Sequence, residues 1–246
     1  MFGRFEVVGP RGTIRITARR QQIILATLVW HANRVVGIES LIDALWGATP
    51  PDTARSQVHI CVSGIRKRLA RSGLHQLVGT ESPGYLARVG TGELDLHVFD
   101  SLVTRGRTLM GAGQPDEASR CLAEALALWR GEPFAGIGSE RVQSMVTQLV
   151  ERYITVSEDY FQLQNRLGRS AHVVGDLMAL VERHPFRERL RGELMVALCH
   201  TGRQAEALRE YRHTRALFVD ELGVEPSWEL RRLEQDILAN RVTAPA

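Results

Sequence analysis

Polar and positively charged side chains gather on one predicted helix between Asp52 and Ser72, DTARSQVHICVSGIRKRLARS. Serine and glutamine can hydrogen-bond base edges, and arginine and lysine bind bases or phosphate oxygens. The set comprises Arg55, Ser56, Gln57, His59, Ser63, Arg66, Lys67, Arg68 and Arg71. Five of these side chains are positive and none is acidic, so a polyanion would relieve their mutual repulsion. The pattern favours nucleic-acid binding over an ordinary solvated surface helix.

The residues that position this helix are also visible in the sequence. Pro50 and Pro51 prevent a preceding helix from running into it, and Asp52 or Thr53 is predicted to cap its first N–H groups. Four apolar residues recur at i, i+4, i+7 and i+11, namely Val58, Val62, Ile65 and Leu69. They predict one narrow buried stripe, with the polar set around the rest of the helix.

Two more helices are predicted before the basic helix, and short strands are predicted on either side of it. A hairpin turns at Gly9–Gly12, and a second turns at Pro83-Gly84. The predicted elements are strands Phe5–Val8 and Thr13–Ile16, helix Arg19–Ala32, strand Val35–Ile38, helix Glu39–Trp46 ended by Gly47, and strands Leu77–Thr80 and Tyr85–Val89. Three helices followed by a hairpin predict a winged helix-turn-helix, whose third helix enters the major groove.

Three segments carry a family resemblance, NRVVGIESLIDALWG, PPDTARSQVHICVSGIRKRLA and SPGYLARV. They resemble the OmpR-type DNA-binding domain of SARP-type antibiotic-pathway activators, which is followed by an all-helical bacterial transcriptional activation domain. The resemblance implies a transcriptional activator of a secondary-metabolite gene cluster. Its implied partners are promoter direct repeats in double-stranded DNA and RNA polymerase holoenzyme, with a homodimer forming on the DNA.

Charge and periodicity both change near residue 95. Residues 1–97 hold 12 Lys and Arg against 7 Asp and Glu, a net charge of +5, whereas the remaining 19 against 21 give −2. This asymmetry suggests a polyanion-binding half joined to a half with another task. We therefore predict a DNA-binding domain over residues 1–95 and a helical activation domain over residues 96–246.

Glycines mark breaks between predicted helices in the second half of the chain. Gly113, Gly168 and Gly202 each separate two helical stretches, and the last two lie 34 residues apart, which is the tetratricopeptide period. Small or apolar residues follow each glycine by five and nine positions, namely Ala118, Val173, Ala207, Leu122, Leu177 and Tyr211. The predicted fold is an α+β winged helix-turn-helix domain followed by an all-α tetratricopeptide-like domain.

The predicted DNA contacts on the basic helix lie outside its apolar stripe; they are Arg55, Ser56, Gln57, His59, Ile60, Ser63, Arg66, Lys67 and Arg68. Gln57 and Ser63 are predicted to hydrogen-bond base edges, and Arg66 and Lys67 to contact a base or a phosphate. Ile60 is a candidate for contact with a thymine methyl group. For Arg55, a phosphate contact and an ion pair within the domain are both open.

Three more DNA contacts are predicted outside that helix. The indole N–H of Trp46 suits a phosphate, although a place in the core is the alternative. Arg34 and Arg88 are predicted to contact the DNA backbone or to be ordinary surface arginines. Gly64 stands where the related sequences usually carry arginine, so it removes one expected DNA contact and lowers helix propensity by about 1 kcal/mol relative to alanine.

Enzymatic alternatives find no support in the sequence. It contains no phosphate-binding G-x-x-x-x-G-K-[ST] motif, no H-E-x-x-H motif and no C-x-x-C pair. We therefore expect no catalytic residues, no metal site and no cofactor. Cys61, Cys121 and Cys199 are too scattered for a disulfide framework. With no signal peptide or membrane span predicted, we expect a cytoplasmic, nucleoid-associated protein.

A second hypothesis concerns the helical half. Tetratricopeptide-like arrays offer a concave surface, so this half could instead be a peptide- or ligand-sensing scaffold that switches DNA binding. Transcription reconstituted without any added ligand distinguishes this hypothesis from a direct activator.

Overall fold

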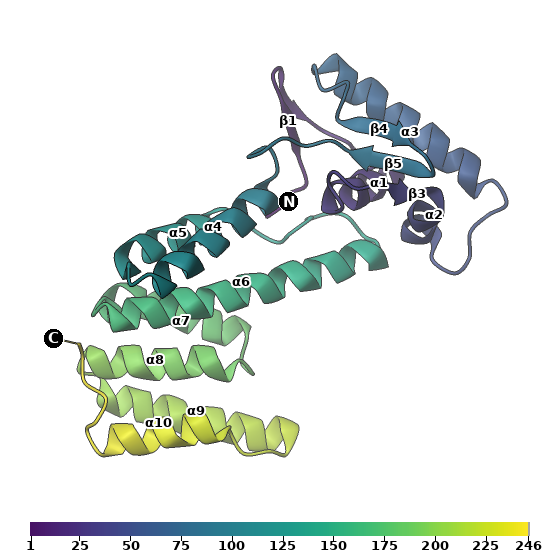
Figure 1. Cartoon of the computed structure of the whole chain (residues 1–246). Coiled ribbons are helices and arrows are strands. Elements are labelled where there is room, and N and C mark those ends of the chain that lie inside the picture. The colour runs from purple at the N-terminus through teal and green to yellow at the C-terminus, as the bar shows by residue number, and fades with distance from the viewer. Residues whose placement is uncertain (246) are drawn as a thin grey trace. The chain divides into compact units, whose positions relative to one another are not determined.

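The computed structural model describes residues 1–245 (Figure 1). Its elements are β1 (Val7–Gly9), β2 (Gly12–Ile14), α1 (Arg19–Trp30), β3 (Val36–Gly37), α2 (Ile38–Trp46), α3 (Ala54–Arg71), β4 (Val78–Glu81), β5 (Gly84–Ala87), α4 (Asp95–Gly111), α5 (Pro115–Ala127), α6 (Glu140–Arg166), α7 (Ser170–Arg183), α8 (Glu188–His200), α9 (Gln204–Leu222) and α10 (Trp228–Leu238). Within residues 1–245, none of these helices has the length and apolar character needed to cross a bilayer.

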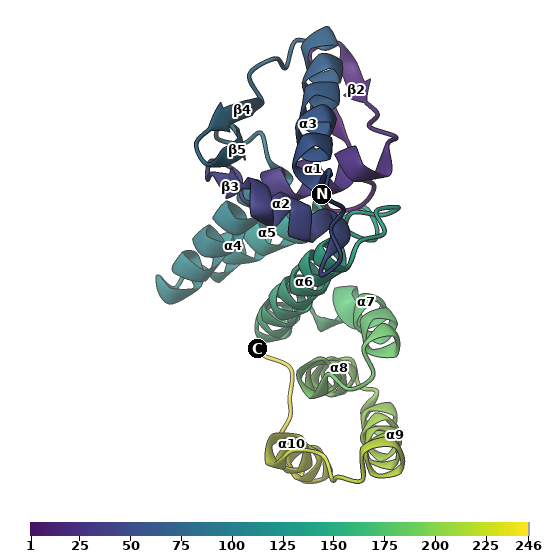
Figure 2. The ribbon, with the colours of Figure 1, turned by 90° about the vertical axis from the view of Figure 1, so that its right-hand side faces the viewer.

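The predicted winged helix-turn-helix is confirmed. Helices α1, α2 and α3 pack on one another, and β5 pairs with both β3 and β4 in an antiparallel sheet. The wing is the hairpin β4–β5, in which Thr80 lies opposite Tyr85. Figure 2 shows α3 between this sheet and the separate hairpin β1–β2. The predicted stripe is buried, since Val58, Val62, Ile65 and Leu69 are each at most 1% exposed.

The start of α3 differs from the sequence prediction. Its N-cap residue is Thr53, but no side-chain oxygen bonds the first N–H groups of the helix. A capping residue normally has an extended backbone, whereas Thr53 has φ −85° and ψ 7°. The Thr53 hydroxyl instead accepts a hydrogen bond of 2.8 Å from the side-chain amide of Gln57. The predicted side-chain cap was therefore wrong.

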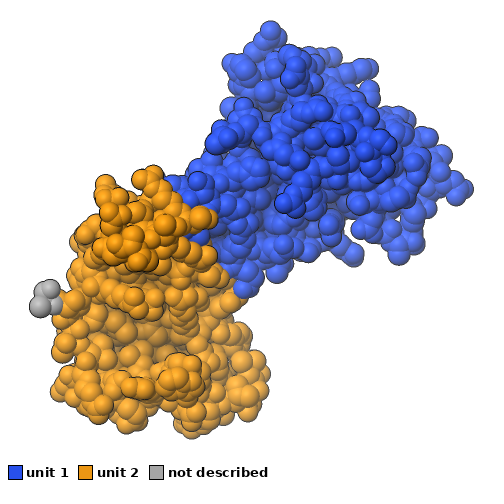
Figure 3. Space-filling model, in the orientation of Figure 1, with its two compact units in different colours: residues 1–103, 124–153 blue, residues 104–123, 154–246 orange. Residues whose placement is uncertain are grey.

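The chain forms two compact units, coloured separately in Figure 3. The first contains residues 1–103 together with residues 124–153. Within it, the first residues of the chain pack on the segment after α5. The Phe2 ring is fully buried and stacks on Trp129 at 4.7 Å between centroids, and the Phe2 carbonyl accepts from Arg130 N–H at 2.9 Å. An isolated β-bridge then joins Arg4 to Ala135.

The second unit contains residues 104–123 and the chain from residue 154 onward. In it α8 packs on α7, and α9 packs on α8, as the layered helices of Figure 1 show. Gly113, Gly168 and Gly202 each lie between two helices, and their φ values of 70–76° favour glycine. The six residues five and nine positions further on are at most 5% exposed. The tetratricopeptide-like prediction is confirmed.

These two units do not coincide with the division predicted at residue 95. Residues 124–153 belong to the compact unit that contains the winged helix. The two compact units reflect which parts of the chain pack most densely on one another. The predicted division at residue 95 instead separates two functions. The functional division at residue 95 stays a prediction.

Candidate nucleic-acid interface

One face of α3 points directly away from the core. Ser56, Ile60, Ser63 and Lys67 follow the same i, i+4, i+7, i+11 spacing as the buried stripe but begin two residues earlier. Two residues turn a helix by about 200°, so this exposed stripe lies opposite the buried one. All four residues are exposed, and Ile60 reaches 70%. A helix in a major groove would present this face to the base edges.

One flank of the exposed stripe is tied to the wing and to α2. The Nδ1 atom of His59 lies 2.6 Å from the Tyr85 hydroxyl. The Arg66 guanidinium donates to the Val78 carbonyl at 2.9 Å and to the Thr80 hydroxyl at 2.7 Å. Arg55 forms an ion pair with Glu39 of α2, which is one of the two alternatives open for that residue. The DNA contacts predicted for these three residues stay predictions.

The other flank of the stripe faces α1. Arg20 donates to the side-chain oxygen of Gln57, and its guanidinium lies 5.3 Å from the centroid of the Trp46 ring. Trp46 itself is half-buried, so its ring supports Arg20 while part of it stays open to solvent. Further along α3, Arg68 donates to the carbonyl of Arg15 at 3.2 Å. These arginines therefore border the exposed stripe and leave its centre uncharged.

Gly64 also lies on the flank that faces α1. A Cβ atom there would meet the Gln21 amide nitrogen at 2.4 Å, so a side chain would point at α1 rather than along the exposed stripe. The sequence interpretation that Gly64 removes a DNA contact stays a prediction. If an arginine were present at this position, only its long side chain could carry the charge past Gln21 to DNA.

We expect Gly64→Ala to stabilise the protein by up to about 1 kcal/mol, because alanine is the better helix former. The methyl group displaces only the end of the flexible Gln21 side chain, whose buried oxygen has no hydrogen-bond partner among the described residues. For a chain of this size, the melting temperature should rise by about 2–4 °C per kcal/mol. Differential scanning calorimetry checks this.

Gly175→Ala is the matched control for this prediction. Gly175 lies within α7, and nothing in the described structure is within 4 Å of a Cβ atom placed there. It therefore reports helix propensity alone. A stabilising Gly175→Ala beside a destabilising Gly64→Ala would show that Gln21 is held rigidly against α3.

Arg34 and Arg88 lie outside α3. Arg34 is exposed in the connection from α1 to β3. The pKa of the nearby His31 imidazole is lowered mainly by burial, and the positive charges of Arg141 and then Arg34 lower it further. Arg88 follows β5, and its guanidinium lies 3.8 Å from the Glu81 carboxylate. Both arginines are exposed, as a backbone contact requires.

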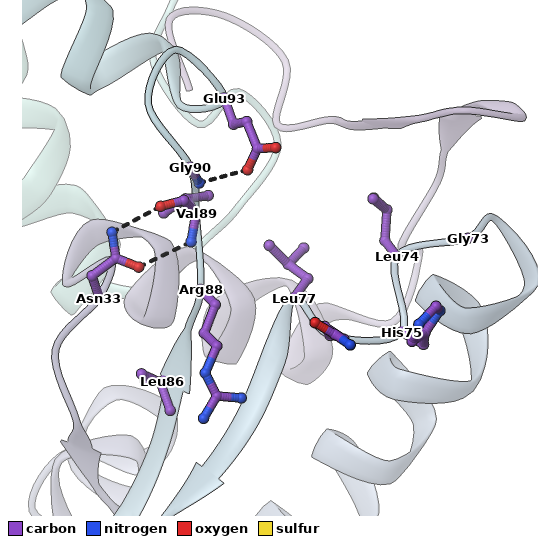
Figure 4. Close-up of a pocket in the computed structure, with 11 residues that line it drawn as sticks. Asn33, Gly73, Leu74, His75, Leu77, Leu86, Arg88, Val89, Gly90 and Glu93 are labelled. Carbon is purple, nitrogen blue, oxygen red and sulfur yellow. Dashed lines mark hydrogen bonds between the residues drawn. The ribbon is translucent and has the colours of Figure 1, made fainter.

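Arg88 also borders a hollow of about 800 Å³ at the base of the wing (Figure 4). The Asn33 amide closes one end, donating to the Val89 carbonyl at 2.9 Å and accepting from the Val89 N–H at 3.0 Å. Glu93 accepts from the Gly90 N–H at 2.6 Å beside it. These three hydrogen bonds hold the loop after β5 along one side of the hollow.

Other reactive side chains are dispersed through the described part of the chain. Residues 1–245 contain no cluster of three or more His, Cys, Asp or Glu side chains that could hold a metal ion. The three cysteines are free thiols. Burial raises the pKa of Cys61, although the charge of Arg20 opposes the shift, and burial also raises the pKa of Cys199. Both thiols therefore stay protonated at neutral pH.

Two residues that position side chains on this surface, Arg20 and Tyr85, were not predicted from the sequence. Arg20 orients Gln57 and covers Trp46, and Tyr85 holds His59 and stacks under the Arg66 guanidinium at 5.5 Å. The adjacent arginines at the start of α1 were a usable signal, because positive charge there is unfavourable for a helix N-terminus. Tyr85 gave no such signal, since an apolar residue in a predicted strand indicates only burial.

Comparisons with known proteins agree with this geometry. A family described as "Transcriptional regulatory protein, C terminal" matches residues 12–87, and one described as "Bacterial transcriptional activator domain" matches residues 94–238. Regulatory protein DnrI of Streptomyces peucetius is 33% identical over 229 residues, which cover 90% of this chain and 84% of that protein.

Two further similarities extend over almost the whole chain. Regulatory protein AfsR of Streptomyces coelicolor is 38% identical over 242 residues, which are 96% of this chain. The fold also matches the solved structure of Mycobacterium tuberculosis EmbR in complex with a low affinity phosphopeptide, with a TM-score of 0.92 and 32% identity over 100% of this chain and 65% of that chain. The chain spans only about a quarter of the length of AfsR, since the match covers 24% of that protein.

Proposed function

Because the chain belongs to the SARP family of transcriptional regulators, we propose that it binds promoter DNA through the exposed stripe of α3 and activates transcription. The family consists of regulators, not enzymes. The abbreviation SARP stands for Streptomyces antibiotic regulatory protein, and this family name points to an antibiotic or other secondary-metabolite gene cluster as the target. Such a role places the protein on the nucleoid.

The observation that carries the proposal is the arrangement of side chains on α3. A stripe of exposed serines, Ile60 and Lys67 lies opposite the buried stripe, and arginines border it on both sides. Hydroxyl groups suit base edges, while the bordering arginines suit the phosphates on either side of a groove. Arg34, Arg88 and Trp46 would extend the phosphate contacts beyond α3.

The proposal assigns a separate role to each half of the chain. Residues 1–95 would bind DNA, and residues 96–246 would contact RNA polymerase holoenzyme. Two copies bound side by side on direct repeats would need repeats about 10–11 bp apart, so that both lie on one face of the duplex.

A selection from random duplex DNA followed by reconstituted transcription tests this function. We expect the full chain to enrich direct repeats with a spacing near one helical turn. On a promoter carrying the enriched repeats, purified protein and polymerase should raise transcript yield with no added ligand. Enrichment of no sequence above background would refute DNA recognition, and enrichment without a transcript increase would refute direct activation.

A second function for the helical half is supported by one observation. A hollow of about 530 Å³ lies among α7, α8 and α9, with apolar walls such as Met178 and Leu194. The buried guanidinium of Arg191 lines it and forms an ion pair with Glu210. A hollow of this kind could bind a peptide or small molecule. This function would be favoured if the purified protein binds the repeats but activates transcription only after cell extract is added.

A further inference from the structure

A large apolar side chain stands at the middle of the exposed stripe of α3. Ile60 is 70% exposed, and the residues before and after it along the stripe are Ser56 and Ser63. An isoleucine that remains in water gains none of the stability that burial gives, and its branched side chain lowers helix propensity. Ile60 therefore contributes little to the stability of the free protein.

The side chains around Ile60 leave its methyl groups accessible. Ser56 and Ser63 are short, and the long side chains on the adjoining flank are held by other partners. His59 is hydrogen-bonded to Tyr85, and Arg66 is bonded to the wing. The middle of the stripe is thus a small apolar surface with a hydroxyl group one turn away on each side.

Only one base presents a matching group in the major groove. Adenine, guanine and cytosine offer hydrogen-bond donors and acceptors there, whereas thymine adds an apolar C5 methyl group. We propose that Ile60 recognises the C5 methyl group of one thymine in each promoter repeat. The inference rests on the proposed function, because it requires the exposed stripe to lie in the groove. Ser56 and Ser63 would then meet the edges of neighbouring bases.

Replacing thymine by deoxyuridine tests the inference, because uracil lacks only the methyl group. Each thymine of a selected repeat is replaced in turn, and the Kd of the full chain is measured by fluorescence anisotropy. We expect one thymine per repeat at which deoxyuridine weakens binding about fourfold, the factor that corresponds to the ~0.8 kcal/mol gained per buried methylene-sized group. In Ile60→Ala the same replacement should leave the Kd unchanged.

Val8→Ala is the matched control. Val8 is also a large exposed apolar residue, at 73%, but it lies on β1 and outside α3. Its variant should keep the fourfold thymine effect. Because both positions are exposed, the melting temperatures of the two variants should stay close to that of the wild type, which excludes misfolding as the cause.

The outcomes separate this inference from the proposed function. If the wild type enriches repeats but no thymine is sensitive to deoxyuridine, the inference is overturned while DNA recognition stands. If Ile60→Ala keeps the same sensitivity as the wild type, another side chain contacts the methyl group and the inference is again overturned. If the wild type enriches no sequence, the proposed function fails and the inference fails with it.

Discussion

Phe2→Ala is expected to lower the free energy of unfolding by about 3–5 kcal/mol, the usual cost of removing a fully buried phenylalanine ring. Phe2 is 0% exposed, and its ring lies 4.7 Å from Trp129 and 5.2 Å from Phe99, measured between centroids. Its N–H also donates to the Asp95 carboxylate at 3.2 Å. Neighbours held by this many contacts cannot collapse fully into the space that the ring leaves.

Urea unfolding of the full chain, followed by circular dichroism, measures this effect. Val8→Ala, a few residues later in the same segment, removes a side chain that is 73% exposed and should change stability by less than about 0.5 kcal/mol. Equal effects of the two substitutions would mean that the first residues are not part of the cooperative core.

The contacts of Phe2 also illustrate what the sequence did not reveal. The pattern of apolar residues predicted the three helices of the winged domain and the helical character of the second half, and turn residues predicted both hairpins, because these features depend on local sequence. It could not predict that residues 1–4 pack on residues 129–135, since neither segment has a regular period. Contacts between irregular segments depend on the tertiary fold, and therefore only the structure revealed them.

The candidate interface shows the same difference. The buried stripe predicted which face of α3 points away from the core, and the structure confirmed the burial of Val58, Val62, Ile65 and Leu69. The partners of Arg66 and Arg68 could not be predicted, because long flexible side chains reach carbonyl groups that the fold brings near. Those carbonyls belong to Val78 and Arg15, 12 and 53 residues away along the chain.

Ser63→Glu is expected to weaken binding to a selected repeat at least about 100-fold. The substitution places a carboxylate at the middle of the exposed stripe, where it would face base edges and nearby phosphates. Like charges brought together at an interface cost several kcal/mol, and a 100-fold loss requires only about 2.7 kcal/mol. The new carboxylate would also lie four residues before Lys67, and the resulting ion pair would withdraw that ammonium from the DNA.

The matched control is Ser101→Glu, which makes the same chemical change at an exposed serine of α4. Its Kd should stay within about twofold of the wild type, and both variants should keep their unfolding free energy within about 0.5 kcal/mol, because both sites are exposed. Anisotropy titrations at two salt concentrations should show the penalty of Ser63→Glu shrinking as salt rises, since mobile ions screen the repulsion. A Ser63→Glu protein that binds like the Ser101→Glu control would place a different face of α3, or a different element, against the DNA.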